Sequence, residues 1–299
     1  MDDKDFIVTV KDLKNKFHAE IQSFYSIKEI ESFNYLLLEH RLDLKRVDIA
    51  LDPNKILSKE EELYFLNALA QLKKEIPIQY VIGETEFFGN PFYVNKDVLI
   101  PRPETEELVQ WVLETNPKDQ RLKTKEQIPN SKILDIGTGS GCIAISLAKN
   151  LPDAKVWALD VSQKALEVAK KNTELNGVKI KFLHVDILKT HEFPVKFDVI
   201  VSNPPYVREL EKEGIKNNVL LNEPHLALFV NDESPLLFYD KIADIAKNYL
   251  TDNGRLYFEI NQYLGDEIVS LLTNKGFQKI ELRKDIFGND RMIFSSFAL

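Results

Sequence analysis

The chain has 299 residues, 44% of them hydrophobic, and a formal net charge of −8 at pH 7. This length allows one large domain or two with a buried core, and the acidic balance disfavours tight, non-specific binding to nucleic acid phosphates. The single cysteine, Cys142, excludes an intrachain disulfide. With no signal-peptide pattern and no apolar run of ~20 residues, the sequence predicts a cytoplasmic protein without a membrane segment.

Residues 1–80 are predicted to form a helical bundle. Ser26 and Ser58 each stand three residues before a glutamate, the spacing of a capping box at a helix start. Apolar residues recur at three- and four-residue steps, which is typical of a buried helix face. They are Val10, Leu13, Phe17, Ile21 and Phe24 in one helix, and Leu63, Leu66, Leu69 and Ala70 in another.

Residues 81–104 are predicted to connect this bundle to a second domain, residues 105–299. Glu86–Val94 predicts two short strands around a turn at Gly89-Asn90-Pro91. Pro103 suits the first position of a helix. The polar stretch 118–131 has no periodic pattern and is predicted to be a loop.

From Lys132 onward, strand and helix patterns alternate, which predicts an α/β fold with an open, mostly parallel sheet covered on both faces. The predicted strands are 132–136, 155–160, 179–185, 197–202 and 255–260, and the predicted helices are 142–150, 163–175, 236–250 and 262–274. Residues 278–285 and 291–297 predict an antiparallel hairpin at the end of the sheet.

The segment Asp135–Gly141 joins the first of these strands to a helix. Its glycines follow the spacing G-x-G-x-G, which matches neither the dinucleotide fingerprint G-x-G-x-x-G nor the phosphate-binding P-loop. Asp160 ends the next strand, where a carboxylate can accept both hydroxyls of a ribose. Asp186 ends the third strand, where it can accept the amine of a base, and Ile187 can pack on the ring. Together these residues predict a nucleoside pocket, and the five histidines show no metal-ligand spacing.

This constellation resembles the class I S-adenosylmethionine-dependent methyltransferases, whose sheet is Rossmann-like with an antiparallel terminal hairpin. The resemblance implies S-adenosyl-L-methionine as the cofactor. The cofactor-binding residues that it implies are Gly137, Thr138, Gly139, Ser140, Gly141, Asp160, Asp186 and Ile187, with Asn203 beside them.

Asn203-Pro204-Pro205-Tyr206 follows the fourth strand of the alternating region. The motif resembles the Asn/Asp-Pro-Pro-aromatic motif of methyltransferases that act on a nitrogen conjugated to a carbonyl or an aromatic ring. Such a nitrogen attacks poorly because it shares its lone pair. The Asn203 side-chain oxygen and the Pro204 carbonyl can each accept one N–H and so orient the lone pair. The motif alone leaves two substrates open, a nucleic acid base and the side-chain amide of glutamine.

Five segments resemble, in chain order, the release factor glutamine methyltransferases: Leu99–Glu106, Asp135–Ala144, Asn203–Val207, Glu223–Leu228 and Asp285–Arg291. The resemblance implies methylation of the glutamine in the Gly-Gly-Gln motif of class 1 peptide chain release factors, and docking of that protein by the helical bundle. It implies that Asn203 and Pro204 are catalytic. The substrate-binding residues are then Asn203, Pro204, Pro205, Tyr206, Arg102 and Glu104. A monomer that contacts no nucleic acid directly is expected.

Three other classes of protein share part of this pattern. An adenine-specific nucleic acid methyltransferase shares the Asn-Pro-Pro-Tyr motif, but is expected to show a basic cleft. A non-enzymatic module with this fold would not need paired amide acceptors. A nicotinamide dehydrogenase is disfavoured by the glycine spacing.

Overall fold

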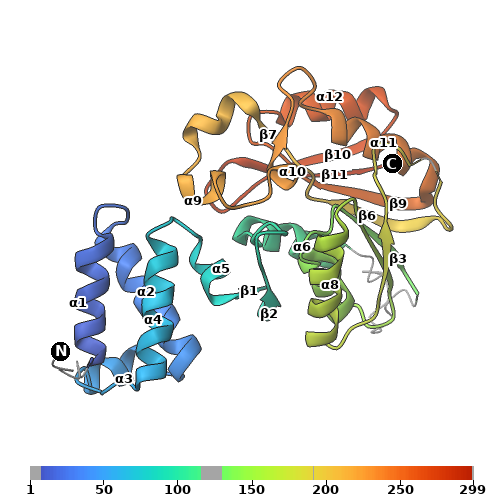
Figure 1. Cartoon of the computed structure of the whole chain (residues 1–299). Helices are drawn as coiled ribbons and strands as arrows, with labels where there is room; N and C mark the ends of the chain where they lie inside the picture. Colours follow the sequence, from blue (N-terminus) through green and yellow to red (C-terminus); the bar gives the residue numbers. More distant parts are fainter. Residues whose placement is uncertain (1–7, 116–129, 191, 298–299) are drawn as a thin grey trace. The chain divides into compact units, whose positions relative to one another are not determined.

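The computed structural model describes residues 8–115, 130–190 and 192–297, which form two compact units (Figure 1). The first unit contains the described residues up to Gly83 together with Asn217–Asn222. The second contains the other described residues. Most of the predicted loop 118–131 lies outside the described residues, and the domain boundaries at residues 80 and 104 stay a prediction.

The first unit is helical, as the sequence predicts. Its helices are α1 Val10–Ile21, α2 Ile27–Leu42, α3 Arg46–Leu51, α4 Lys59–Leu72 and α5 Ile78–Ile82, joined by α9 Asn217–Leu220. Both predicted capping boxes are confirmed, because the Ser26 and Ser58 hydroxyls accept from the backbone N–H groups of Glu29 and Glu61. The predicted burial is wrong at Phe24, which lies past the end of α1 and is 51% exposed.

The buried face of α4 also differs from the prediction. Leu63 is 60% exposed and Ala70 is exposed as well, whereas the residues buried in the core of this unit are Phe65, Ala68, Leu69 and Leu72. The series Leu63, Leu66, Leu69 and the series Phe65, Leu69, Leu72 both fit a helical repeat, so spacing alone does not decide which stripe of α4 faces its neighbours.

The second unit is built on a mostly parallel sheet. Its strands are β3 Lys132–Ile136, β4 Lys155–Asp160, β5 Ile180–His184, β6 Phe197–Ser202, β9 Leu250–Glu259, β10 Lys279–Lys284 and β11 Asp290–Ser296. Within the described residues the strand order is β10-β11-β9-β6-β3-β4-β5. Strands β5, β4, β3, β6 and β9 are parallel, while β11 is antiparallel to β9 and to β10. The predicted α/β fold with an antiparallel terminal hairpin is confirmed.

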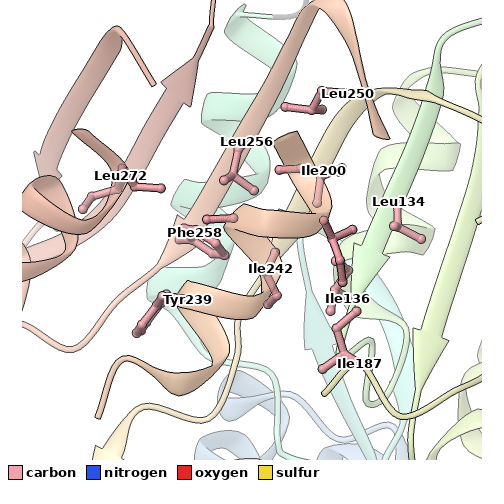
Figure 2. Close-up of a cluster of buried hydrophobic side chains, with 14 of the residues drawn as sticks. Leu134, Ile136, Ile187, Ile200, Tyr239, Ile242, Leu250, Leu256, Phe258 and Leu272 are labelled. Carbon is pink, nitrogen blue, oxygen red and sulfur yellow. The ribbon is translucent and has the colours of Figure 1, made fainter. Parts of the chain in front are cut away.

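Helices pack on both faces of this sheet because successive strand residues point in opposite directions. The long helices are α6 Pro103–Thr115, α7 Cys142–Asn150, α8 Gln163–Leu175, α11 Leu237–Tyr249 and α12 Gly265–Asn274. Leu134 and Ile136 lie in one cluster with residues of α11 and α12, including Ile242 and Leu272 (Figure 2). Ile133, one residue before Leu134 and therefore on the other face of β3, lies in the opposite cluster with α6 and α7.

The short elements of this unit complete the connections. They are β1 Glu84–Phe87, β2 Asn90–Tyr93, β7 Val207–Arg208, the 3₁₀ helix Glu209–Gly214, α10 His225–Leu228 and β8 Phe229–Val230. The predicted hairpin is present as β1 and β2, but its turn is Phe88-Gly89, both at positive φ, and Pro91 lies within β2. A proline is tolerated there because β2 is an edge strand, paired in the described ranges with β1 alone.

Candidate active site

A cavity of about 270 Å³ lies at the carboxyl ends of the parallel strands. The chain runs outward from β3 to β4 and β5 and then returns to β6 on the other side of β3, so the strand order reverses between β3 and β6. Ligands of open α/β sheets bind at such a switch point. The predicted site residues that line the cavity are Arg102, Gly137, Thr138, Gly139, Ser140, Asp160, Asp186, Ile187, Asn203, Pro204 and Pro205.

Gly141, Glu104 and Tyr206 are not among the residues that line this cavity. Gly141 precedes α7 at φ +84°, and a Cβ there would lie 3.0 Å from Ile145 Cδ1 and 3.2 Å from Ala169 Cβ. Its glycine therefore serves the tight turn and the packing of α7 against α8. The roles of these three residues toward ligands stay predictions.

The glycine loop is fastened to the end of β4 through Asp160. One carboxylate oxygen accepts from Gly139 N at 2.9 Å and the other from Ser162 N at 2.8 Å. Burial raises the pKa of Asp160, although these backbone donors oppose the shift. The two backbone donors hold the carboxylate at the cavity wall. Because each oxygen can still accept another hydrogen bond, the carboxylate is in a position to bind hydroxyl groups.

Asp186 and Ile187 continue the cavity wall after β5. The Asp186 carboxylate accepts from Leu188 N at 3.0 Å and lies 3.0 Å from Lys189 Nζ, which lowers the pKa of Asp186. Ile187 is 8% exposed and packs in the cluster drawn in Figure 2. This places an acceptor and an apolar surface side by side, as a bound purine ring would require.

The Asn203-Pro-Pro-Tyr motif leaves β6 directly beside the glycine loop. Ser202 anchors the end of the strand, since its hydroxyl donates to Ile136 O at 2.7 Å. A Cβ on Gly137 would lie 4.0 Å from the backbone oxygen of Asn203, so the loop and the motif are neighbours. The sequence prediction that these two motifs share one site therefore agrees with where they lie.

Tyr206 is turned toward the interior of the unit. Its hydroxyl donates to Glu259 Oε1 at 3.0 Å, and its backbone oxygen accepts from Asn261 Nδ2 at 2.9 Å. Burial, together with the nearby Glu259 charge, raises the pKa of Tyr206 well above its usual value. The phenol is thus a neutral hydrogen-bond donor that anchors the end of the motif.

Arg102 and Glu223 connect the segments Leu99–Glu106 and Glu223–Leu228, two of the five that carry the family resemblance. Arg102 Nη2 lies 2.6 Å from Glu223 Oε1, while Glu223 Oε2 accepts from Ile100 N at 3.2 Å. The Glu223 side chain is almost fully buried, so these two donors compensate a charge that water does not reach. Pro224 and Ala227, just after it, line the cavity.

The sequence interpretation assigned no role to Thr105 or Glu259, yet both are buried next to the motif. Thr105 Oγ1 donates to Glu259 Oε2 at 2.6 Å and accepts from Asn203 Nδ2 at 3.3 Å. Burial raises the pKa of Glu259, and the Arg291 guanidinium opposes that shift. The signal in the sequence is an acidic residue inside the otherwise apolar segment 256–260.

Asp285 and Arg291 from the terminal hairpin complete the surroundings of Glu259. Asp285 accepts from Phe287 N and Asn289 N at 2.9 Å each and from Arg291 Nε at 3.1 Å. The segment Asp285–Arg291 therefore forms a turn, fastened by Asp285, that holds the Arg291 guanidinium near the Glu259 carboxylate. Within the described ranges, no group of three or more metal-ligating side chains is gathered.

Fold and site define a class I methyltransferase. A family model described as "Methyltransferase small domain" matches residues 120–228. A solved methyltransferase from Pyrococcus furiosus has a TM-score of 0.51 at 17% identity, covering 81% of this chain and 100% of that one. The Thermus thermophilus 16S rRNA N2 G1207 methyltransferase, solved with AdoMet and guanosine, also has a TM-score of 0.51, at 20% identity over 71% of this chain and 49% of its own.

The chain belongs to the release factor glutamine methyltransferase family. The enzyme of that name from Flavobacterium psychrophilum is 56% identical over 288 residues, covering 96% of this chain and 99% of the relative. The one from Bacteroides thetaiotaomicron is 43% identical, covering 91% and 95%. A second family model, "PrmC N-terminal domain", matches residues 28–83. The predicted family is confirmed and is favoured over a nucleic acid methyltransferase.

Proposed function

We propose that this protein transfers a methyl group from S-adenosyl-L-methionine to the side-chain amide nitrogen of the glutamine in the Gly-Gly-Gln motif of class 1 peptide chain release factors. The observation that carries the proposal is the placement of Asn203 and Pro204 against the glycine loop, in a chain 56% identical to a release factor glutamine methyltransferase.

The residues at the carboxyl ends of β3, β4 and β5 fit the cofactor. Asp160 is pre-positioned for ribose hydroxyls by two backbone donors, and Asp186 with Ile187 offers a place for adenine. Among the described residues, Asp135 Oδ1 is buried below the loop without a hydrogen-bond partner, and a ligand or a water at this site can satisfy such an atom. When bound, the cofactor supplies an electrophilic methyl group on a sulfonium.

Asn203 and Pro204 orient the reacting nitrogen. An amide nitrogen carries two N–H groups and shares its lone pair with the carbonyl, so it is a weak nucleophile. The Asn203 side-chain oxygen and the Pro204 carbonyl each accept one of these N–H groups, which turns the lone pair toward the methyl group. The two prolines fix the backbone that carries the acceptors. As the nitrogen gains the methyl group it would release one proton to water, and the thioether S-adenosyl-L-homocysteine would leave as the second product.

The partner surface is proposed to lie on the helical unit. Val47, Leu51 and Ile56 are 59%, 80% and 64% exposed there, and large apolar side chains left exposed are suited to contact a protein. The net charge of −8 argues against nucleic acid as the partner. We expect a monomer acting in the cytoplasm; within the described residues no helix has the length and hydropathy of a membrane span.

The test is transfer of a radiolabelled methyl group from S-adenosyl-L-methionine to a class 1 release factor. A factor with the motif glutamine changed to alanine and a structured RNA serve as controls. Labelling of the wild-type factor alone is expected. Equal labelling of the alanine factor would refute the assignment of the methylated residue.

The matched variants are Asn203→Ala and Asn248→Ala. Asn203→Ala should lower kcat by roughly 100-fold, because an oriented acceptor is lost, while the Kd for the cofactor stays within about 3-fold. Asn248 lies on the exposed face of α11, where its amide donates to Asp244 O, and its variant should match the wild type. A parallel loss of cofactor binding in Asn203→Ala would contradict the separate roles given to the motif and the loop.

A further inference from the structure

We propose that Thr105 and Glu259 are positioning residues, which hold the Asn203 side-chain amide with its oxygen presented to the cavity. The inference rests on the proposed function, because it explains how one of the two acceptors is aimed. It joins three segments far apart in the chain, the start of α6, the end of β6 and the end of β9.

The contacts define a hydrogen-bond chain with one direction. Thr105 has a single hydroxyl proton, and it uses that proton in the 2.6 Å hydrogen bond that it donates to Glu259 Oε2. An ionised carboxylate only accepts, so the hydroxyl of Thr105 has only lone pairs left for another neighbour. That neighbour is Asn203 Nδ2, at 3.3 Å.

The second oxygen of Glu259 is also occupied. Tyr206 donates to Oε1 at 3.0 Å, so each carboxylate oxygen accepts one hydrogen bond from a hydroxyl group. Since Tyr206 follows Asn203 by three residues, the same carboxylate fastens the motif at both ends. Arg291, held by Asp285, supplies the positive charge that favours the ionised form of Glu259.

This direction fixes the orientation of the Asn203 amide. If the amide turned over, its oxygen would face the lone pairs of Thr105, or Thr105 would have to withdraw its proton from the buried Glu259. Both arrangements leave a buried acceptor without a donor. Because Nδ2 is used by Thr105 and no described residue donates to Oδ1, the oxygen is left for the ligand. Both Asn203 and Thr105 line the cavity.

The experiment compares Thr105→Val, Thr105→Ser and Glu259→Gln in methyl transfer to a release factor. Thr105→Val keeps the shape but removes the acceptor, so kcat should fall roughly 10- to 100-fold while KM for the release factor and cofactor Kd stay within about 3-fold. Thr105→Ser keeps the hydroxyl and should retain kcat within about 3-fold. Thr115→Val, at the other end of α6, is the control for loss of a hydroxyl from that helix.

Glu259→Gln tests whether the carboxylate acts through Thr105. Its kcat should fall roughly 3- to 10-fold, and the double variant with Thr105→Val should be no slower than Thr105→Val alone, because both changes break one chain. A double variant as slow as the product of the two single effects would overturn this role of Glu259, as would wild-type kcat in Glu259→Gln. Wild-type kcat in Thr105→Val would overturn the proposal as a whole.

A second measurement needs no release factor, so it separates this inference from the proposed function. In protein labelled with ¹⁵N-asparagine, the side-chain NH₂ signal of Asn203 is assigned by its loss in Asn203→Ala. Its hydrogen exchange should be at least about 10-fold faster in Thr105→Val than in wild type and Thr105→Ser. Unchanged exchange would overturn the proposed orientation, even where methyl transfer behaves as expected.

Discussion

The Asp135 carboxyl group is fully buried below the glycine loop. Thr138 Oγ1 donates to Oδ2 at 2.6 Å, while Oδ1 has no hydrogen-bond partner within the part of the chain that the structure describes. Burial raises the pKa of Asp135 to about 7, with a smaller contribution from the Asp160 charge. An unfolded aspartate titrates near ~3.9. The native chain therefore keeps this proton over a pH range in which the unfolded chain has lost it.

The sign of the effect follows from linkage. Stability from the protonated carboxyl is fully present below about pH 4 and is lost as pH rises toward about 7, because the native state then binds one more proton than the unfolded state. The slope is about 1.4 kcal/mol per pH unit and ends near pH 7, where the native state also loses the proton, so wild type should lose about 3 kcal/mol between pH 5 and pH 8.5 from this group, nearly all of it below about pH 7. Asp135→Asn has no such proton and should not show this loss.

The assay is urea unfolding of wild type and Asp135→Asn without cofactor at several pH values, followed by tryptophan fluorescence. Trp111 and Trp157 both lie in the second unit, so the signal reports the unit that contains Asp135. Other titrating groups are shared by the two proteins, and their effects largely cancel in the difference between the free energies of unfolding. A difference that stays constant from pH 5 to pH 8.5 would refute the reasoning.

Three further outcomes are expected. Asp160→Asn should weaken cofactor binding roughly 10- to 100-fold by calorimetry, because a neutral amide replaces a charged acceptor for hydroxyl groups; unchanged affinity would remove Asp160 from the ribose site. Gly141→Ala should lower the free energy of unfolding by about 2–3 kcal/mol in the fluorescence assay, since its φ is +84° and the new Cβ would crowd Ile145 and Ala169; a wild-type midpoint would contradict this. Ser58→Ala should cost the first unit about 1 kcal/mol through loss of the α4 cap, seen as faster amide exchange in that helix alone.

Much of both units could be predicted from the sequence because the signals are local. Strand β6 and helix α8 begin and end where the alternation of apolar residues and the flanking turn residues indicate, and Ser58 caps its helix through a contact three residues away. The exposed Leu63 was misjudged for a different reason. Which stripe of α4 is buried depends on neighbouring helices, and no spacing within α4 contains that information.

The candidate site also contains residues that local motifs predict and residues that only the fold brings together. The glycine loop and Asn203 were visible as motifs, and the rule for strand ends in α/β sheets predicted that they share an edge. The contact between Thr105 and Glu259 joins residues 154 positions apart. It depends on β9 lying next to β6 and on α6 covering the same end of the sheet, which no short pattern states. The buried acid in β9 was a signal, but its partner became evident only in three dimensions.

A buried carboxylate is a costly way to hold a turn in place, since a neutral side chain of similar size avoids the loss of hydration. Glu259 nevertheless accepts from two hydroxyl donors, Thr105 and Tyr206, and the Arg291 cation lies near enough to lower its pKa against the effect of burial. What a carboxylate offers and a neutral amide lacks is a pair of oxygens that can only accept. Such a group sets the direction of every hydrogen bond that ends on it. A fixed hydrogen-bond direction matters where the next group in the chain is an amide that must present its oxygen to a ligand. Asn203 is that amide, since its Nδ2 donates to Thr105.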